Sequence, residues 1–289
     1  AKWLASAGIA GQTRDVDLPD YLSVLGLPPE TPAELRDGQF HDVVLTDSEA
    51  YRFPRSEAAR IELPARAAAL VALSSAGFDF AVPEPIAPVQ ASEPVGRCYL
   101  ATTRVPGSPL ARADIREPDR IGAELGRVLA ALADATPRLR GLVEEAEPDR
   151  WERFAADVEA ELFASMSADG RARARRELDA LVAYRSTAPS ALSHDDLGGD
   201  NLLWAAGPTL VGVIDWDGLC IGSPANDVAS IAATYGWPLA ERAVDDLPDP
   251  GALLAEARLV QATFALQQAL PAVRTGDLEN LDDGLQRYR

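Results

Sequence analysis

Long stretches of the chain repeat apolar residues every three or four positions, with polar residues between them. That period puts the apolar side chains on one face of a helix, so each stretch predicts an amphipathic helix. The predicted helices cover residues 56–76, 121–133, 151–166, 171–184, 228–235 and 252–269. Pro64 is expected to interrupt the first helix, and Pro137 and Pro148 to lie in the loop between the second and the third.

Short apolar runs bounded by turn residues predict strands in the first third of the chain. They cover residues 40–45, 50–53 and 99–105, and the last run ends before Pro106 and Gly107. Residues 1–35 are expected to be helical and loop-like, because their prolines prevent a long helix. All the predicted strands lie within residues 1–105, and five of the six predicted helices lie within residues 106–289. The chain is long enough for two lobes, and we expect an α+β protein with one lobe at residues 1–105 and a second at residues 106–289.

The balance of charge restricts the partners. The chain has 289 residues, with 45 acidic and 27 basic side chains and a formal net charge of −18. Such a surface repels nucleic acid and anionic lipid and favours encounter with a cation. No apolar stretch approaches the roughly 20 residues that cross a bilayer, and the N-terminus lacks the apolar region of a secretory signal. With Cys98 and Cys220 as its two cysteines, we expect a reduced, monomeric, cytoplasmic protein without nucleic-acid or membrane partners.

One motif carries the candidate chemistry. His194, Asp196 and Asn201 follow the spacing H-x-D-x-x-x-x-N, and Asp215 ends a later apolar run. The protein-kinase signature has the same order and nearly the same spacing. Asp196 is the predicted catalytic residue, because its carboxylate can accept the proton of an attacking hydroxyl group. Asn201 and Asp215 offer the oxygen ligands that Mg²⁺ prefers, so they are the predicted metal ligands.

Neighbouring residues are given less direct roles. We expect His194 to pack beneath the loop and fix its backbone. Asp195 and Asp217 are candidates for contacts close to the metal or with a cationic substrate, although an outward-facing side chain is the simpler expectation for Asp195. Asp227 is expected at a helix start that braces the loop, outside the site.

Lys2 is the only lysine in the chain, so the lysine with which kinases hold nucleotide phosphates must have a substitute. Arg52 occupies the expected place and Arg55 is the second candidate, since a guanidinium group can hold two phosphate oxygens at once. The alternative is that Arg52 is an ordinary strand residue at the surface. Glu62 is the predicted acidic partner of the phosphate-binding residue, with Arg66 one turn later.

The sequence around the last of these aspartates, Ile-Asp-Trp-Asp at 214–217 with Gly-Ser-Pro-Ala-Asn-Asp at 222–227, resembles the aminoglycoside phosphotransferase and choline kinase-like family. The resemblance implies a two-lobed protein-kinase-like fold, with a small N-terminal lobe containing an antiparallel sheet and a larger, mainly helical C-terminal lobe. It also implies transfer of the γ-phosphate of ATP or GTP, with Mg²⁺, to a hydroxyl group of a small molecule. Further nucleotide-binding positions that it implies are the loop at Gly38 and the backbone of Thr103, Arg104 and Val105.

Residues 263–270 resemble the branch of this family that acts on basic cyclic peptide antibiotics of the viomycin and capreomycin type. That branch implies a serine hydroxyl group of the peptide as acceptor, and resistance to the drug as the result. Two alternatives stay open: a phosphotransferase for an aminoglycoside, a macrolide or an amino alcohol, and a nucleotide-binding pseudokinase without turnover. Carboxylates of the later helices are candidates to meet a cationic acceptor: Asp157, Glu161, Glu241 and Glu256.

Overall fold

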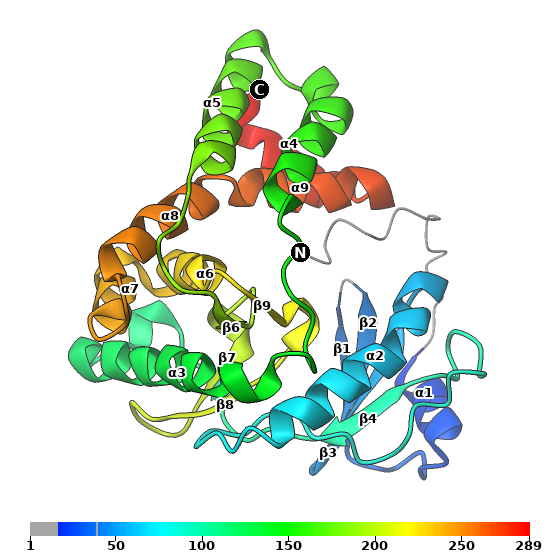
Figure 1. Cartoon of the computed structure of the whole chain (residues 1–289). Coiled ribbons are helices and arrows are strands. Elements are labelled where there is room, and N and C mark those ends of the chain that lie inside the picture. Colours follow the sequence, from blue (N-terminus) through cyan, green and yellow to red (C-terminus); the bar gives the residue numbers. More distant parts are fainter. Residues whose placement is uncertain (1–16, 39) are drawn as a thin grey trace. The chain divides into compact units, whose positions relative to one another are not determined.

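Figure 1 presents the computed structural model, which describes residues 17–38 and 40–289. The described residues form two compact units. The smaller unit contains residues 17–107 together with Val211–Trp216, and the larger unit contains Ser108–Leu210 and Asp217–Arg289. The expectation for residues 1–16 lies outside the described residues.

The smaller unit is built on an antiparallel sheet of four strands in the order β1-β2-β3-β4 (Figure 1). Its core is formed by aromatic and aliphatic residues of the sheet and of the first helix. The strands expected at 40–45, 50–53 and 99–105 are present, whereas β1 was not predicted because its four residues contain only one apolar side chain. The elements are α1 (Leu18–Leu25), β1 (Glu34–Asp37), β2 (His41–Leu45), β3 (Glu49–Pro54), α2 (Glu57–Ser74) and β4 (Leu100–Thr103).

Helix α2 runs through Pro64 without a break, so the expected interruption was wrong. Ser56 caps the helix by accepting a hydrogen bond from the backbone N–H of Ala59. An internal proline removes one backbone hydrogen bond and crowds the preceding turn, at a cost of about 3 kcal/mol. Buried leucines on both sides of it, Leu63 and Leu70, hold the helix against the rest of the unit and offset that cost.

The larger unit is mainly helical (Figure 1). Short strands β6 and β9 pair antiparallel, as do β5 and β7. No helix of the described residues is both long and apolar enough to cross a membrane. The remaining elements of the chain are β5 (Ser108–Pro109), η2 (Arg112–Asp114), α3 (Pro118–Leu139), α4 (Arg150–Glu161), η3 (Phe163–Ser165), α5 (Ala168–Ala183), β6 (Ala191–Ser193), η4 (Gly199–Asn201), β7 (Leu202–Trp204), β8 (Leu210–Val213), η5 (Trp216–Gly218), β9 (Cys220–Gly222), α6 (Ala225–Tyr235), α7 (Trp237–Val244), α8 (Pro250–Ala262), α9 (Phe264–Thr275), α10 (Leu278–Leu285) and η6 (Gln286–Tyr288).

Two predicted helices have different ends in the structure. Helix α3 continues through Pro137, which was expected in a loop. The helix predicted over residues 252–269 is two helices, because the chain leaves the helical path at Thr263. The fully buried Thr263 donates its hydroxyl hydrogen to the carbonyl oxygen of Val260 at 2.8 Å and accepts from Gln267, so local hydrogen bonds stabilise the bend.

The C-terminal residues belong to the hydrophobic core formed by α4, α5, α9 and α10. Tyr288 is fully buried, and its hydroxyl group donates to Glu177 at 2.6 Å. Its backbone carbonyl oxygen lies against the start of α5, where it accepts from the N–H of Ser167 at 3.1 Å. Gly170 permits this approach, because a Cβ atom there would overlap the Tyr288 carbonyl oxygen.

We therefore predict that Gly170→Ala destabilises the protein by about 1–3 kcal/mol, the usual cost of overpacking. Gly251→Ala is the matched control, because Gly251 is also in the first turn of a helix but has open space around its Cβ position. The control is expected to be neutral or slightly stabilising. Urea denaturation of the two variants measures the difference, and equal free energies of unfolding would contradict this account of the C-terminal packing.

Candidate active site

The loop after β6 exposes one carboxylate among buried neighbours. His194 and Leu197 are fully buried and Asp195 is 8% exposed, whereas the Asp196 side chain reaches solvent. The expected packing role of His194 agrees with this burial. Buried residues therefore anchor the loop on both sides of Asp196 and leave its carboxylate accessible.

Asp196 and Asn201 are joined across the loop. The Asn201 amide nitrogen donates to the Asp196 backbone oxygen at 2.9 Å and to its carboxylate Oδ2 at 3.2 Å. Ser230 donates to the other carboxylate oxygen at 3.4 Å. With both amide hydrogens engaged, the Asn201 side-chain oxygen is left without a donor among the described residues. A fixed, available amide oxygen is a suitable ligand for Mg²⁺.

Helix α6 holds the loop along one face. Asn226, Ser230 and Thr234 are spaced four residues apart, which puts them in one row on the helix. Thr234 Oγ1 accepts from the backbone N–H of Gly199 at 2.8 Å, beyond the Ser230 contact with Asp196. The loop is therefore hydrogen-bonded at successive points to a single helix.

Asp227, expected to brace the loop, lies at the start of α6 and is fully buried. Its Oδ2 accepts from the Ser193 hydroxyl group at 2.8 Å and from the backbone N–H of His194 at 3.0 Å. Burial raises the pKa of the Asp227 carboxyl from 3.8 to about 6.

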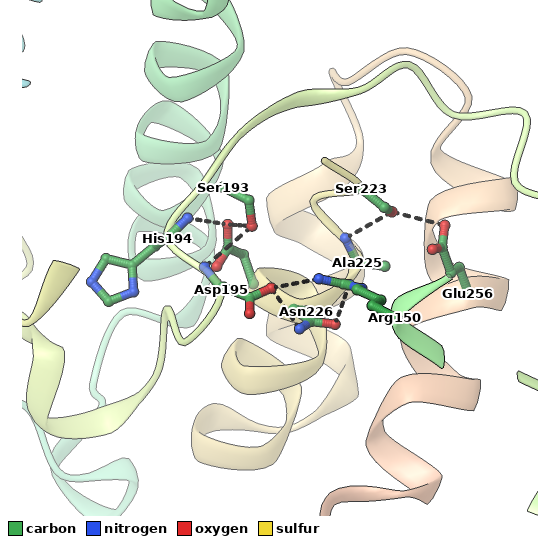
Figure 2. A network of polar contacts seen from close by, with 9 residues as sticks. Arg150, Ser193, His194, Asp195, Ser223, Ala225, Asn226 and Glu256 are labelled. Atoms are coloured by element: carbon green, nitrogen blue, oxygen red, sulfur yellow. Dashed lines mark hydrogen bonds and ion pairs between the residues drawn. The ribbon is translucent and has the colours of Figure 1, made fainter. Parts of the chain in front are cut away.

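The Asp195 side chain was expected to face outward, but it does not. Figure 2 shows its carboxylate directed to Arg150 and Asn226, on the side of the loop away from the His194 ring. The Arg150 guanidinium lies 3.1 Å from Asp195 Oδ1, and both side chains are buried. Asp195 is therefore buried and paired within the protein. Arg150 was not predicted, since nothing local in the sequence marks an arginine 45 positions earlier as its partner.

In the smaller unit, Asp215 is paired with an arginine. The Arg52 Nη2 atom lies 3.0 Å from Asp215 Oδ1, and the backbone of Asp215 adopts a left-handed conformation with φ 61°. His41 contacts Arg52, because the His41 Nδ1 atom lies 3.5 Å from the same guanidinium. Burial, with the charges of Arg52 and Arg66, lowers the pKa of His41 to about 2, so the imidazole is neutral and supports Arg52 as an acceptor.

The ion-pair partners of Glu62 and Arg52 differ from the prediction. Glu62 accepts from Arg66 at 2.6 Å within α2, whereas Arg52 donates to Asp215. The Arg66 side chain is only 12% exposed, so this ion pair is partly buried. Arg55 donates to the backbone oxygen of Gly38 at 2.8 Å and thereby holds the loop before β2.

The segment that is expected to bind the purine, residues 103–105, begins at the last residue of β4. The backbone N–H of Thr103 donates to Glu84 at 2.9 Å, and that of Arg104 donates to Ser48 at 2.8 Å. In the part of the chain that the structure describes, no acceptor contacts the N–H of Val105. Of the three positions, Val105 is therefore the one whose N–H is available to a ligand.

Comparisons with known proteins identify the family of the chain. The model of the phosphotransferase enzyme family matches residues 34–275. Viomycin phosphotransferase of Streptomyces vinaceus is 40% identical over 282 residues, which cover 93% of this chain and 97% of that protein. The chain belongs to the phosphotransferase enzyme family.

Solved structures with low sequence identity share the fold. The GDP and kanamycin complex of APH(2")-IIia matches with a TM-score of 0.79 at 17% identity, covering 92% of this chain and 95% of that one. Macrolide 2'-phosphotransferase MphH from Brachybacterium faecium matches with a TM-score of 0.68 at 20% identity, covering 94% and 97%. The predicted fold class, with an antiparallel sheet near the N-terminus and a mainly helical C-terminal part, is confirmed, and so is the predicted enzyme class, a phosphotransferase.

The carboxylates that were expected to meet a cationic acceptor form contacts with other side chains of this phosphotransferase. Asp157 and Glu161 share Arg274, at 2.9 and 3.0 Å. Glu241 pairs with Arg258, and Glu256 is buried and accepts from a serine hydroxyl group. Since two carboxylates share the one guanidinium of Arg274, that cluster keeps a net negative charge. Asp217 is half-buried in η5.

The raised pKa of Asp227 generates a prediction. The folded protein binds a proton at Asp227 more tightly than the unfolded chain, so its contribution to stability is present below about pH 4 and is lost as the pH rises through about 6. Asp227→Asn does not titrate. Its free energy of unfolding, relative to the wild type, should therefore rise by up to about 3 kcal/mol between pH 4 and pH 7.

Urea denaturation at both pH values measures this change. Asp200→Asn, at an exposed position of the same loop, controls for the loss of one negative charge. A difference between Asp227→Asn and wild type that is the same at pH 4 and pH 7 would show that Asp227 titrates normally.

Proposed function

We propose that this phosphotransferase transfers the γ-phosphate of ATP or GTP to a hydroxyl group of a basic cyclic peptide antibiotic of the viomycin and capreomycin type, and so confers resistance. The observation that carries the proposal is the 40% identity to viomycin phosphotransferase over 93% of the chain. The serine hydroxyl group of the peptide is the proposed acceptor.

Asp196 is the proposed catalytic residue. Its carboxylate is accessible and accepts hydrogen bonds from Asn201 and Ser230. This arrangement supports the role of orienting the acceptor hydroxyl group and receiving its proton. Phosphoryl transfer has a loose transition state, so positioning and charge stabilisation supply most of the rate enhancement. A carboxylate that is already fixed needs no reorganisation when the acceptor arrives.

Asn201 and Asp215 are the proposed ligands of Mg²⁺. Their donor set suits the ion, because Mg²⁺ takes hard oxygen ligands and the Asn201 side-chain oxygen is available. When bound, Mg²⁺ would neutralise charge on the nucleotide phosphates. Asp215 contributes the negative charge and Asn201 a neutral oxygen.

Arg52 is the proposed phosphate-binding residue in place of a lysine. Its guanidinium lies beside Asp215 and is supported by the neutral His41, which supports a contact with phosphates next to the metal. Gly38, held by Arg55, is proposed to contribute backbone contacts to the same phosphates. The purine is proposed to bind the backbone of residues 103–105, with the Val105 N–H as donor.

The acceptor is proposed to be cationic because the protein is acidic. A net charge of −18 attracts a polycation and raises its encounter rate. The Asp157, Glu161 and Arg274 cluster keeps one net negative charge on the helical unit. A molecule with a single positive charge would gain less from this field than a polycation.

Arg52→Ala should weaken ATP binding about 10- to 100-fold, the loss expected for charge-assisted hydrogen bonds. Adenosine should bind equally to both proteins, because it has no phosphates, and Arg52→Lys should recover part of the loss. Arg60→Ala is the matched control, since Arg60 pairs with Glu57 on α2. Isothermal titration with each ligand measures the effect, and unchanged ATP affinity in Arg52→Ala would assign the phosphates to Arg55 or to the Gly38 backbone.

The acceptor is tested by mass spectrometry after incubation with nucleotide and Mg²⁺. Viomycin and capreomycin should each gain one phosphate on a serine hydroxyl group, and kanamycin and erythromycin should be poor acceptors. The specificity constant for the peptides should fall as salt rises, since screening shortens the reach of surface charge to about 8 Å at physiological ionic strength. Asp196→Ala controls for enzymatic transfer and should lose several orders of magnitude in turnover. Phosphate on kanamycin or erythromycin, with none on either peptide, would refute the proposed acceptor.

A further inference from the structure

Asp195 has a backbone conformation that side chains disfavour. Its φ of 69° lies in the left-handed region, which glycine adopts freely and most other residues adopt at a cost of about 1–2 kcal/mol. Aspartate tolerates this region better than most residues, but it gains nothing there unless its side chain makes contacts. The contacts of the Asp195 carboxylate therefore account for an aspartate at this position.

Those contacts close a triangle of three buried side chains (Figure 2). Asp195 Oδ1 accepts from Arg150 Nη1 at 3.1 Å and from Asn226 Nδ2 at 2.6 Å. Arg150 Nη2 donates to the side-chain oxygen of Asn226 at 3.2 Å. The side chains of Arg150 and Asp195 are only 7% and 3% exposed. The triangle thus ties together the first residue of α4, the catalytic loop and the second residue of α6.

The same loop is tied to its surroundings on the other side of Asp195. The backbone N–H of Asp195 donates to the Ser193 hydroxyl group at 3.2 Å, and that hydroxyl group donates to the buried Asp227. Gly218 packs directly on the loop, because a Cβ atom there would lie 2.9 Å from the Asp195 Cβ and from the His194 carbonyl oxygen. These contacts fix the backbone of Asp195, and that backbone sets the direction of the next side chain, Asp196.

We propose that Arg150, Asp195 and Asn226 form a positioning unit for Asp196 that links helix α4 to the catalytic loop. Arg150 and Asp195 act through the backbone of the loop and touch neither the nucleotide nor the acceptor. Removing one member leaves the other as an unpaired buried charge, which is strongly destabilising, whereas replacing both by uncharged residues removes that penalty. Stability and positioning can therefore be separated by experiment.

The test is a double-mutant cycle with Asp195→Gly and Arg150→Met. Glycine accepts the left-handed backbone without strain, and methionine fills most of the arginine volume without charge. Each single variant should lower both the melting temperature and kcat. The double variant should recover melting temperature, while its kcat stays about 10- to 100-fold below wild type, the loss expected for a misplaced catalytic group. The KM for nucleotide should change less than about twofold throughout.

The inference rests on the proposed role of Asp196, so kcat is measured with whichever acceptor the wild type phosphorylates. Asp196→Ala is measured in the same assay. If Asp196→Ala turns over normally, the proposed role of Asp196 fails, whatever the cycle shows. Amide hydrogen exchange of residues 193–201 gives a readout that needs no acceptor, and it should be faster in the double variant than in the wild type.

Tyr288→Phe is the control for a purely structural effect. It removes a buried hydrogen bond from the C-terminal core and should lower the melting temperature without changing kcat. The positioning role is overturned if kcat of the double variant returns to within about twofold of wild type. It is equally overturned if the single variants lower melting temperature alone, or if Tyr288→Phe lowers kcat as much as they do.

Discussion

The buried polar face of helix α6 is the constraint on which the larger unit depends. A buried carboxylate must take its hydrogen bonds from the protein. Asp227 Oδ2 accepts from Ser193 and from the backbone of His194, whereas Oδ1 has no hydrogen-bond partner among the described residues. These partners are the residues that lead into the catalytic loop. Burying Asp227 therefore costs solvation, as its raised pKa indicates, and its two hydrogen bonds offset part of that cost while they fix the start of the loop.

Fixing the loop in this way has a chemical consequence. Helix α6 contacts the loop on both sides of Asp196, through Asn226 at Asp195 and through Thr234 at Gly199, and Ser230 between them contacts the Asp196 carboxylate. Asp196 stays accessible while its neighbours are buried. A carboxylate held before the substrates arrive suits phosphoryl transfer, because positioning supplies most of the catalysis and mobility would reduce it.

The near absence of lysine changes the electrostatics of the smaller unit. Arg52 and Arg66 lie close enough to lower the pKa of the buried His41, and a lysine in such a position would readily lose its proton. Burial also lowers the pKa of Arg66, but a guanidinium begins from so high a value that it keeps its charge at neutral pH. Arginine can therefore remain cationic beside a second cation, where it is available to Asp215.

Local patterns determined the class of elements and the chemistry. The apolar period marked most helices, the spacing of Asp196, Asn201 and Asp215 marked the kinase-type motif, and the residues at 214–217 and 222–227 marked the family. Tertiary structure alone decided the partners of buried charges. Arg150 meets Asp195 across 45 positions of sequence, and Arg52 meets Asp215 across 163 positions, although Glu62 was expected as its partner. Periodicity reports which face of an element is buried, but an ion pair depends on which distant segments meet, and no local pattern encodes that.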